Sequence, residues 1–539
     1  MRTFFVFITG GVVSGLGKGI VAASVGKILQ ARGYRVSMVK LDPYLNPDPG
    51  TMNPVEHGEI FVTEEVWEFS PYEGVCFKIA EIDEDFGHYE RFLNRNMHPS
   101  NNVTSGQVML QVILGEREGR YLGQTVRLIP HVVDEIKRRI YLSAEREGAD
   151  FLIVELGGTV GDYEAEAFVE ALRQIRNENP GRCVHIHVSY IPFLRTTGEH
   201  KTKPAQMFIR IASGAGIPPD AIVVRSEEFV SDSVIRKLSL YSGVPERAVF
   251  RSPDQKNVYM VPITLESEGL GRFIEERFRL SRRKPYLDDW VRTVSKFDSE
   301  SRLRIGILSK YWRMKDVHIS IIEALRHAAG ELGYGLEVVK IDAVETSRLP
   351  EMDGLLVAPG FGRKGTENMI EASWRAFESG IPTLGICFGA QLMTVSFARN
   401  KMGWDGANST ELDPETPYPV VDLLPEQRGI KGLGGTMRLG SHEVVLVEGS
   451  VLRRAYGREV VRERFRHRYH IVRDYAEMMR NEGYVICATD VSGRIINAFE
   501  VEGHPFFVGV QFHPEYKSRP GRPNPTYMGF IRAVLEIKG

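Results

Sequence analysis

The stretch IPTLGICFGAQ, residues 381–391, decides how the second half of this chain is built. Its apolar first part, from Ile381 to Cys387, is typical of a buried strand, and the residues from Gly389 onward open a helix. Cys387 therefore lies on a tight strand-to-helix turn, the thiol counterpart of a nucleophile elbow. Because the N-terminal end of a helix is positive, this position favours the thiolate form of the cysteine.

Two residues far downstream supply the partners that a thiol nucleophile needs. His513 can serve as the base, and Glu515 can fix the tautomer of the imidazole, as in a catalytic triad. A lone buried cysteine is more often a small apolar core residue. The glycines beside Cys387 and the sequence around His513 favour the catalytic interpretation instead. The sequence therefore predicts a cysteine hydrolase that releases ammonia from glutamine.

The composition is that of an ordinary globular protein, long enough for roughly two to four domains. The 539 residues are 42% hydrophobic and 26% charged, and the net charge of -2 gives no general attraction to nucleic acid or anionic membranes. The four cysteines form no CxxC pair, which argues against a disulfide framework and a zinc site. The apolar run Phe4 to Thr9 is too short for a signal peptide or a span. We therefore expect a cytoplasmic protein without nucleic-acid or membrane partners.

Two series of alternating strands and helices predict an α/β protein. In the first series, a buried strand over Phe4 to Thr9 precedes a helix over Lys18 to Gln30, the opening of a parallel, doubly wound sheet. Charge clusters and weak periodicity predict a linker over 281–302, between a first domain at 1–280 and a second at 303–539. The remaining predicted elements are strands at 36–40, 151–155, 184–188, 221–224, 303–308, 336–341 and 354–358, and helices at 165–176, 320–332 and 367–377.

The turn after the first strand, GGVVSGLGKGI at 10–20, is glycine-rich in the manner of a phosphate-binding loop. Glycines let backbone N–H groups face phosphate oxygens at a helix N-terminus, and Lys18 adds a mobile positive charge. The match to GxxxxGK[ST] is approximate, because the spacing from Gly11 to Gly17 is one residue too long and Gly19 replaces the hydroxyl residue. Such a site must take its magnesium ligands from elsewhere.

Asp85 and Glu155 are the candidate magnesium ligands. Glu155 closes an apolar strand, at the edge where open α/β sheets bind ligands, and magnesium prefers one or two carboxylates plus phosphates and water. The alternatives are a solvated acidic run around Asp85 and a buried Glu155 satisfied by backbone N–H groups. The segment 201–206 could grip a triphosphate with its two lysines, although such a pair is usually a solvated surface.

These and further motifs resemble the CTP synthase family over nearly the whole chain. The resemblance implies a glutamine-dependent amidotransferase that converts UTP to CTP. It also implies an N-terminal synthase (amidoligase) domain with a P-loop-like, doubly wound parallel sheet, and a C-terminal class I glutamine amidotransferase α/β domain. The matching stretches are 10–20, 40–46, 48–52, 57–59, 87–92, 157–162, 201–204, 434–440 and 466–469.

The resemblance assigns roles to individual positions. The implied ATP-binding residues are Ser14, Gly15, Leu16, Gly17, Lys18, Gly19, Ile20 and Asp85, with Lys18 and Lys40 catalytic and with Asp85 and Glu155 on magnesium. UTP and CTP would be bound by Ser14, Asp162, Tyr163, Glu164, Lys201, Thr202, Lys203, Pro204, Ala205, Gln206 and Lys237. The amidotransferase residues are the triad Cys387, His513 and Glu515, and the oxyanion and glutamine contacts Gly360, Phe388, Gly389, Ala390, Gln391, Glu411 and Arg468. His57 would line the ammonia passage.

The cofactors and partners also follow from the resemblance. It implies ATP as co-substrate, Mg²⁺, UTP and glutamine, with CTP as inhibitor and GTP as allosteric activator. The family forms homotetramers, and filament formation stays open. Lys364 and Asn368 stand where the family has arginine and glycine, which leaves the GTP response open. Pro359 stands where a glycine is expected, and since proline lacks an N–H it leaves the oxyanion turn open.

The largest departure from the family pattern is the segment from Glu65 to Ile82, which replaces a shorter acidic stretch. Its aromatic, partly alternating residues predict a hairpin around 72–74. Together with Arg127, Tyr163 and Ala165, the segment leaves two alternatives: a surface hairpin on a UTP-aminating enzyme, or a paralogue that aminates another pyrimidine or related acceptor. A third alternative is a nucleotide-binding assembly protein with reduced catalysis, against which the intact triad argues.

Overall fold

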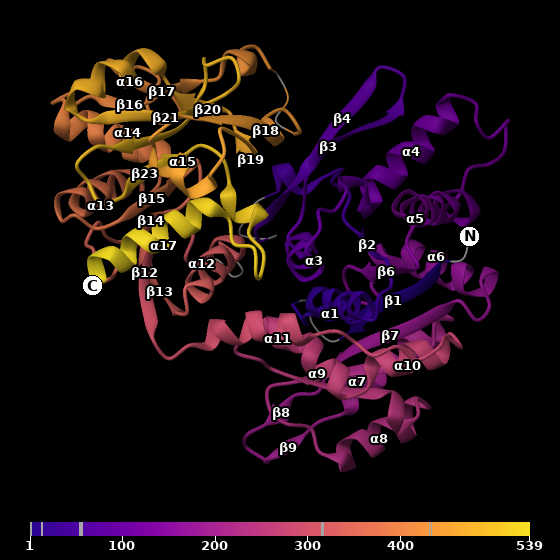
Figure 1. The fold of residues 1–539 in the computed structure, drawn as a ribbon. Helices are drawn as coiled ribbons and strands as arrows, with labels where there is room; N and C mark the ends of the chain where they lie inside the picture. The colour runs from indigo at the N-terminus through magenta and orange to yellow at the C-terminus, as the bar shows by residue number, and fades with distance from the viewer. Residues whose placement is uncertain (1–2, 12–14, 53–57, 314–316, 431, 433) are drawn as a thin grey trace. The chain divides into compact units, whose positions relative to one another are not determined.

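The chain folds into two compact α/β units (Figure 1). The computed structural model describes residues 3–11, 15–52, 58–313, 317–430, 432 and 434–539. Unit 1 comprises Met1–Asp48, Trp67–Ile79 and Asp85–Val294, and unit 2 comprises Pro49–Val66, Ala80–Glu84 and Ser295–Gly539. The segment predicted as a linker contains helix α11 (Asp288–Ser295). The domain bounds expected from the sequence stay a prediction.

Unit 1 is built on a parallel sheet. Among the described residues it has seven strands in the order β11-β10-β7-β1-β6-β2-β5, and every neighbouring pair is parallel. The predicted parallel sheet is confirmed. The strands are β1 (Phe4–Gly11), β2 (Val36–Asp42), β5 (Asn102–Thr104), β6 (Phe151–Leu156), β7 (Cys183–Tyr190), β10 (Ala221–Ser226) and β11 (Val249–Pro253).

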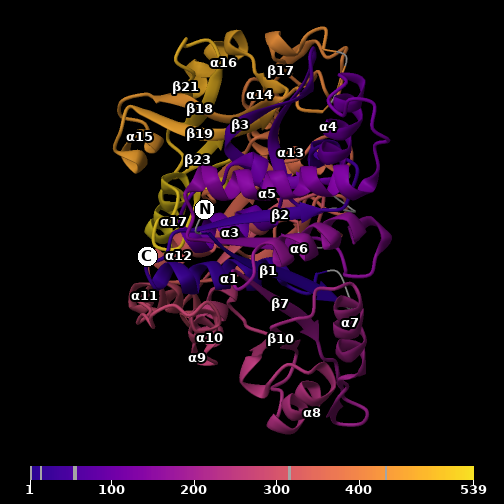
Figure 2. The ribbon, with the colours of Figure 1, turned by 90° about the vertical axis from the view of Figure 1, so that its right-hand side faces the viewer.

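Helices cover both faces of this sheet because its strands are apolar on both sides. On β6, Leu152 and Val154 pack with α5 and α6, whereas Ile153 lies against Gly26 of α1. Figures 1 and 2 both show α5 beside β2, which it contacts. The helices are α1 (Lys18–Ala31), α3 (Asp85–Leu93), α4 (Ser105–Arg117), α5 (Val133–Glu147), α6 (Glu166–Glu178), α7 (Lys203–Gly214), α8 (Asp232–Ser242), α9 (Val261–Ser267) and α10 (Leu270–Arg277).

The inserted segment forms the predicted hairpin. Strand β3 (Ile60–Tyr72) pairs with β4 (Val75–Asp83), and Gly74 at the turn has a φ of 77°, which glycine adopts without strain. The part of the hairpin from Trp67 to Ile79 belongs to unit 1, where Trp67 and Phe69 pack on the guanidinium of Arg139, and its two base segments belong to unit 2. The remaining short strands of unit 1 are β8 (Phe193–Leu194) and β9 (Glu199–His200).

Unit 2 is built on a mixed sheet. Its described residues form nine strands in the order β13-β12-β14-β15-β23-β22-β21-β18-β19; the first five are mutually parallel and the others are antiparallel. The sequence predicted the parallel strands β12, β13, β14 and β15 but neither β23 nor the antiparallel extension. The strands are β12 (Arg302–Ser309), β13 (Gly335–Asp342), β14 (Gly354–Val357), β15 (Thr383–Ile386), β18 (Arg438–Leu446), β19 (Val460–His467), β21 (Tyr484–Thr489), β22 (Ile496–Val501) and β23 (Phe507–Val510).

Alternate residues of the central strands feed two apolar cores, one on each face of the sheet. Leu356 packs with helices α12, α15 and α17, whereas Leu355 and Val357 pack with α13 and α14. The helices are α12 (Ile319–Glu331), α13 (Thr366–Glu378), α14 (Phe388–Lys401), α15 (Val451–Tyr456), α16 (Arg473–Met479) and α17 (Pro525–Lys538). Strands β16 (Ala407–Ser409), β17 (Tyr418–Leu423) and β20 (Tyr469–Ile471) form a small separate sheet.

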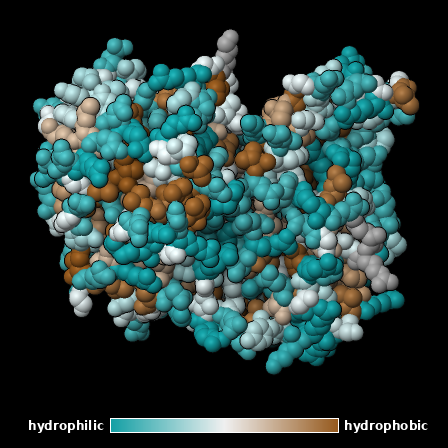
Figure 3. Space-filling view, turned by 45° about the horizontal axis from the view of Figure 1, so that its top comes forward, coloured by the Kyte–Doolittle hydropathy of each residue, from teal (hydrophilic) through white to brown (hydrophobic). Residues whose placement is uncertain are grey.

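The surface is largely polar. Hydrophilic residues cover most of the face drawn in Figure 3, and apolar residues gather on it in small groups. Among the described residues, no helix has the length and apolar character that a membrane span requires.

Candidate active site

Cys387 lies on the predicted elbow between β15 and α14. Its φ of 53° and ψ of -108° are a strained conformation for a residue with a side chain, of the kind that active sites hold. The backbone N–H of Cys387 donates to the carbonyl of Val510 at 2.7 Å. A Cβ atom at Gly389 would lie 2.1 Å from the carbonyl oxygen of Val357, and one at Gly385 would lie 2.3 Å from Met393 Sδ. The flanking glycines are therefore required for the turn to pack against the sheet.

His513 and Glu515 lie together in the same buried site. His513 Nδ1 is 2.7 Å from Glu515 Oε1, and both side chains are almost fully buried. Burial disfavours a charged ring, but the charges of Glu515 and Cys387 outweigh it and raise the pKa of His513 to about 10. The other ring nitrogen, Nε2, has no hydrogen-bond partner in the part of the chain that the structure describes. The arrangement supports a thiolate–imidazolium pair oriented by a carboxylate.

A cavity of about 410 Å³ opens beside Cys387. Its lining includes five residues that the sequence analysis assigned to the oxyanion hole and the glutamine site, whereas Gly389 and Ala390 are buried in the first turn of α14. The full lining is Gly50, Thr51, Gly360, Phe361, Cys387, Phe388, Gln391, Glu411, Met437, Arg466, His467, Arg468 and Tyr469.

Hydrogen bonds fix the polar side chains of this cavity. Glu411 accepts from the N–H of Gly362 at 2.8 Å, and its burial raises the pKa of the carboxyl group. The Gln391 amide donates to the carbonyl of Tyr469 at 2.9 Å, and Arg468 donates to Gln427 at 2.8 Å. An acid, an amide and a guanidinium held around one cavity suit a ligand that carries both an amino group and a carboxylate.

A second, smaller cavity of about 100 Å³ lies on the His513 side of the thiol. It shares Gly360, Phe361, Cys387 and Arg466 with the larger cavity, so these four residues stand between the two spaces. The other lining residues are Gly58, Glu59, Ile60, Tyr311, Val317, His318, Pro359, His513, Glu515 and Tyr516. His57, predicted to line an ammonia passage, lies outside the described residues.

No role was predicted for Lys310, Tyr311 or Arg466, although Arg466 lies in the family-like stretch 466–469. Lys310 Nζ lies 4.7 Å from the ring centre of Phe388, and burial lowers its pKa to about 8. Tyr311 donates to the carbonyl of Phe361 and accepts from the N–H of that residue. Lys310 and Tyr311 follow β12 at the carboxyl edge of the parallel strands, where ligands bind, and this position was a signal that could have found them.

The glycine-rich turn of unit 1 leads into α1 at Lys18. Gly15 and Gly17 have positive φ values of 71° and 86°, and the Lys18 ammonium donates to the carbonyl of Gly158. Burial, the largest influence, lowers the pKa of Lys18. A Cβ atom at Gly19 would lie 1.9 Å from an Asp85 carboxylate oxygen, so this glycine allows that carboxylate to reach the turn. Leu16 lies in the turn and Ile20 in the first turn of α1, whereas Ser14 lies outside the described residues.

Lys40, Asp85 and Glu155 converge beside this turn. Lys40 forms an ion pair with Asp85, and Tyr89 donates to Glu155. Burial, followed by the charge of Asp85, raises the pKa of Glu155 to about 8. Two carboxylates fit a magnesium ion that takes its other ligands from phosphates and water. Across the described residues, no group of three or more His, Cys, Asp or Glu could hold a metal alone.

The predicted UTP residues occupy two places in unit 1. Lys201 pairs with Glu199, whose carboxylate also interacts with Lys237 on α8. Thr202 is buried before α7, and Gln206 donates to its hydroxyl at 2.9 Å. Lys203, Pro204 and Ala205 form the first turn of α7. Asp162 accepts from the N–H of Thr159, and Tyr163 and Glu164 lie in the exposed turn before α6.

Comparisons with known proteins agree over both units. The family model described as CTP synthase N-terminus matches residues 4–280, and the model for class-I glutamine amidotransferases matches residues 313–533. A CTP synthase from Pyrobaculum aerophilum is 48% identical over 99% of this chain and 99% of its own length. One from Thermus thermophilus is 46% identical over 98% and 96%. The solved glutaminase domain of Trypanosoma brucei CTPS with bound acivicin is 32% identical, covering 43% of this chain and 94% of its own, with a TM-score of 0.41.

Proposed function

The chain belongs to the CTP synthase family and forms CTP from UTP, and we propose that the cysteine site of unit 2 and the lysine–carboxylate cluster of unit 1 divide the reaction. The reaction consumes ATP, UTP, glutamine and water and yields CTP, ADP, phosphate and glutamate. The observation that carries the proposal is the strained Cys387 elbow, which lies between a 410 Å³ cavity and a smaller cavity lined by His513 and Glu515.

In the proposed glutaminase reaction, the Cys387 thiolate attacks the amide carbon of glutamine. The N–H groups of Phe388 and Gly360 would stabilise the oxyanion, and His513 would donate a proton to the departing ammonia. Water then hydrolyses the thioester and frees glutamate and the thiolate. Gln391, Glu411 and Arg468 would orient the substrate. With Gly360 as the donor of this turn, the missing N–H of Pro359 would not disable it.

In the proposed synthase reaction, ATP phosphorylates O4 of the uracil ring and ammonia then displaces the phosphate at C4. Lys18 and Lys40 would offset the charge on the transferring phosphoryl group, which is the main service that a protein gives such a transition state. Asp85 and Glu155 would hold a magnesium ion, which supplies charge neutralisation when it is bound. The ATP phosphates would lie against the backbone N–H groups of residues 15–20.

The binding of UTP and of the regulators is also proposed. The lysines at 201, 203 and 237 would contact the triphosphate of UTP or of inhibitory CTP, with residues 162–164 on the CTP side. GTP activation and a homotetramer come from the family as further proposals, and Lys364 and Asn368 make the GTP response the first of them to test. The relatives that match over almost their full length do not favour a different acceptor or a catalytically reduced protein.

The proposed function is tested with the purified chain in the presence of ATP, Mg²⁺ and glutamine. UTP, dUTP and other pyrimidines are supplied in parallel, and the aminated product is identified by mass spectrometry. We expect CTP from UTP, with glutamate formed in an equal amount. Amination of another pyrimidine in preference to UTP would contradict the assignment of UTP as the acceptor.

A further inference from the structure

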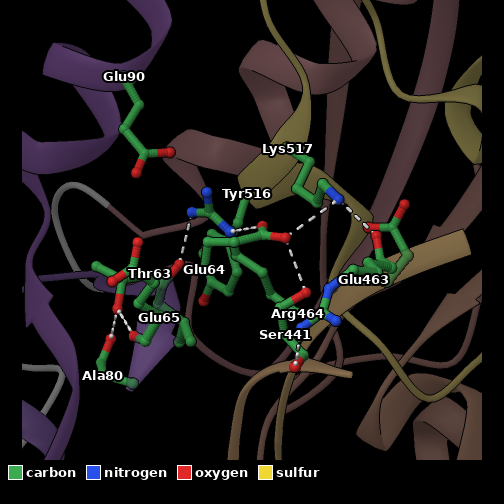
Figure 4. Close-up of polar contacts among 12 residues, drawn as sticks. Thr63, Glu64, Glu65, Ala80, Glu90, Ser441, Glu463, Arg464, Tyr516 and Lys517 are labelled. Carbon is green, nitrogen blue, oxygen red and sulfur yellow. Dashed lines mark hydrogen bonds and ion pairs between the residues drawn. The ribbon is translucent and has the colours of Figure 1, made fainter. Parts of the chain in front are cut away.

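Two acidic residues near the base of the β3–β4 hairpin meet two arginines of strand β19 within unit 2. Glu64 Oε2 lies 3.3 Å from Arg464 Nε, and Glu81 Oε1 lies 2.6 Å from Arg466 Nε. Figure 4 shows the first of these pairs, with Ser441 donating to the other oxygen of Glu64 at 2.9 Å. Arg464 also donates to the carbonyl of Val62 at 2.7 Å. The hairpin base is therefore joined to β19 through side chains and backbone.

These pairs are protected from water to different degrees. Glu81 is 1% exposed and the Arg466 side chain is 21% exposed, whereas the Arg464 side chain is fully buried. A buried carboxylate or guanidinium needs a partner, because each is strongly solvated when it is exposed. The Glu81–Arg466 pair is thus a defined contact rather than one of several equivalent surface arrangements.

The backbone of β19 holds both members of the catalytic pair. The carbonyl of Arg464 accepts from the N–H of His513 at 2.8 Å, and the carbonyl of Arg466 lies 3.6 Å from Cys387 Sγ. A shift of this strand would therefore move the contacts of the base and of the nucleophile together. Misplacement of reacting groups by about 1 Å can cost roughly 100-fold in rate.

Arg466 also faces the reaction directly. It lines both the large cavity and the small one, and so stands between the two spaces beside Cys387. Burial opposes its charge, but Glu81, Tyr516 and Cys387 together raise the pKa of Arg466.

We infer that Glu81 is a positioning residue of the glutaminase, which acts through Arg466 to hold strand β19 against Cys387 and His513. The inference rests on the proposed function of the cysteine site. Glu81 belongs to the segment that departs most from the family pattern, so the hairpin contributes to the cysteine site and is more than a surface addition.

The test replaces Glu81 and measures two reactions in the same full-length enzyme. We expect Glu81→Gln to lower kcat for glutamine hydrolysis by about 10- to 100-fold, with KM changed less than about threefold. Alkylation of Cys387 by iodoacetamide should slow in the same variant. CTP formation from ammonia should stay within about threefold of the parent, because that reaction does not use the thiol. Glu81→Asp, which keeps the charge, should recover part of the loss.

Glu443→Gln is the matched control. Glu443 of β18 pairs with Arg462 of β19 at 3.9 Å, but both side chains are about half exposed. Its replacement removes an ion pair from β19 without touching the cysteine site, so hydrolysis should be unchanged.

Three outcomes would overturn the inference. They are a normal kcat in Glu81→Gln, a rise in KM alone, or an equal loss of ammonia-dependent synthesis with a lower unfolding temperature. If Glu81→Gln does not fold, Glu81→Asp decides. The aspartate is one methylene group shorter, so its carboxylate lies farther from Arg466, and a fully normal kcat in this variant would contradict the positioning role of Glu81. Cys387→Ala is assayed in parallel. If this variant still hydrolyses glutamine, the proposed function itself is contradicted. If Cys387→Ala is inactive but Glu81→Gln hydrolyses glutamine normally, only this inference is contradicted.

Discussion

The cysteine site of unit 2 and the lysine–carboxylate cluster of unit 1 differ in how far the protein itself satisfies their charges. His513 is paired with Glu515, and Glu411 is bonded to a backbone N–H beside an open cavity. In unit 1, Lys40 is paired with Asp85 and Tyr89 donates to Glu155, but burial and the charge of Asp85 raise the pKa of Glu155 to about 8, so its negative charge is disfavoured without a further cation. The thiol site is preorganised for a neutral amide, whereas the cluster is arranged for charges that its ligands bring.

This difference follows from the two reactions. Hydrolysis of an amide by a thiolate needs a nucleophile, a base and oxyanion donors, all of which side chains and backbone provide. Phosphoryl transfer needs compensation of several negative charges, for which proteins combine lysines with a metal held by carboxylates. The two sites should therefore respond differently to substitution.

The largest expected effect is that of Cys387→Ala, which should abolish the reaction of the cysteine site and leave that of the lysine–carboxylate cluster unchanged. Cys387→Ala should reduce glutamine-dependent CTP formation by at least about 10⁴-fold, because the nucleophile is lost, and should leave ammonia-dependent formation intact. Steady-state rates with each nitrogen source measure this. Cys76→Ala, at an exposed cysteine of the hairpin, is the control and should match the parent. Loss of both activities in a folded Cys387→Ala protein would show that the sites are not separable.

Lys40→Ala should impair the lysine–carboxylate cluster of unit 1. We expect CTP formation to fall by about 10²- to 10³-fold with either glutamine or ammonia, because a charge that offsets the phosphoryl group is removed. Lys78→Ala, at an exposed position on β4, provides the control. Normal turnover of ammonia in Lys40→Ala would remove this lysine from the mechanism.

Glu155→Gln tests whether the carboxylates of this cluster hold magnesium. The Mg²⁺ concentration for half-maximal ammonia-dependent synthesis should rise by about 10- to 100-fold, since one oxygen ligand loses its charge. The dependence of the rate on Mg²⁺ measures this shift. Glu145→Gln, on the exposed side of α5, should keep the parent value. An unchanged Mg²⁺ dependence would assign Glu155 a purely structural role.

The smallest effect concerns the pKa of His513. Burial lowers the pKa of His513, whereas Glu515 and Cys387 raise it to about 10, so Cys387→Ala should lower the pKa from that value. A protonated ring contributes stability that is fully present below about pH 6.5 and is lost as the pH rises through about 10. NMR titration of the imidazole in both proteins measures the shift. An identical pKa in the two proteins would exclude a thiolate–imidazolium pair.

Much of the fold followed from local patterns. The predicted strands at 4–9, 36–40 and 151–155 became β1, β2 and β6, and the predicted helix at 18–30 became α1, each within a few residues of its observed ends. Continuous apolar runs and glycine turns carry this information in the sequence itself. The hairpin around Gly74 was predicted for the same reason.

Contacts between distant segments could not be predicted in this way. Nothing in the local pattern of β4 or β19 indicates that Glu81 pairs with Arg466, 385 residues later in the chain. The antiparallel strands β21, β18 and β19 mix buried and exposed residues and were missed, because such residues give a weaker signal than continuous apolar runs. The buried strands β22 and β23 were also missed.

The sequence by itself determined the elbow at Cys387, the glycine-rich turn at Lys18 and the two α/β series, because each depends on residues close together in the chain. Only the tertiary structure decided which side chains share a site. It brought the His513–Glu515 pair beside the thiol, set Arg466 between two cavities and paired it with Glu81 at the hairpin base. The physical reason is that burial and charge pairing depend on the packing of the whole fold, and no local pattern encodes that packing.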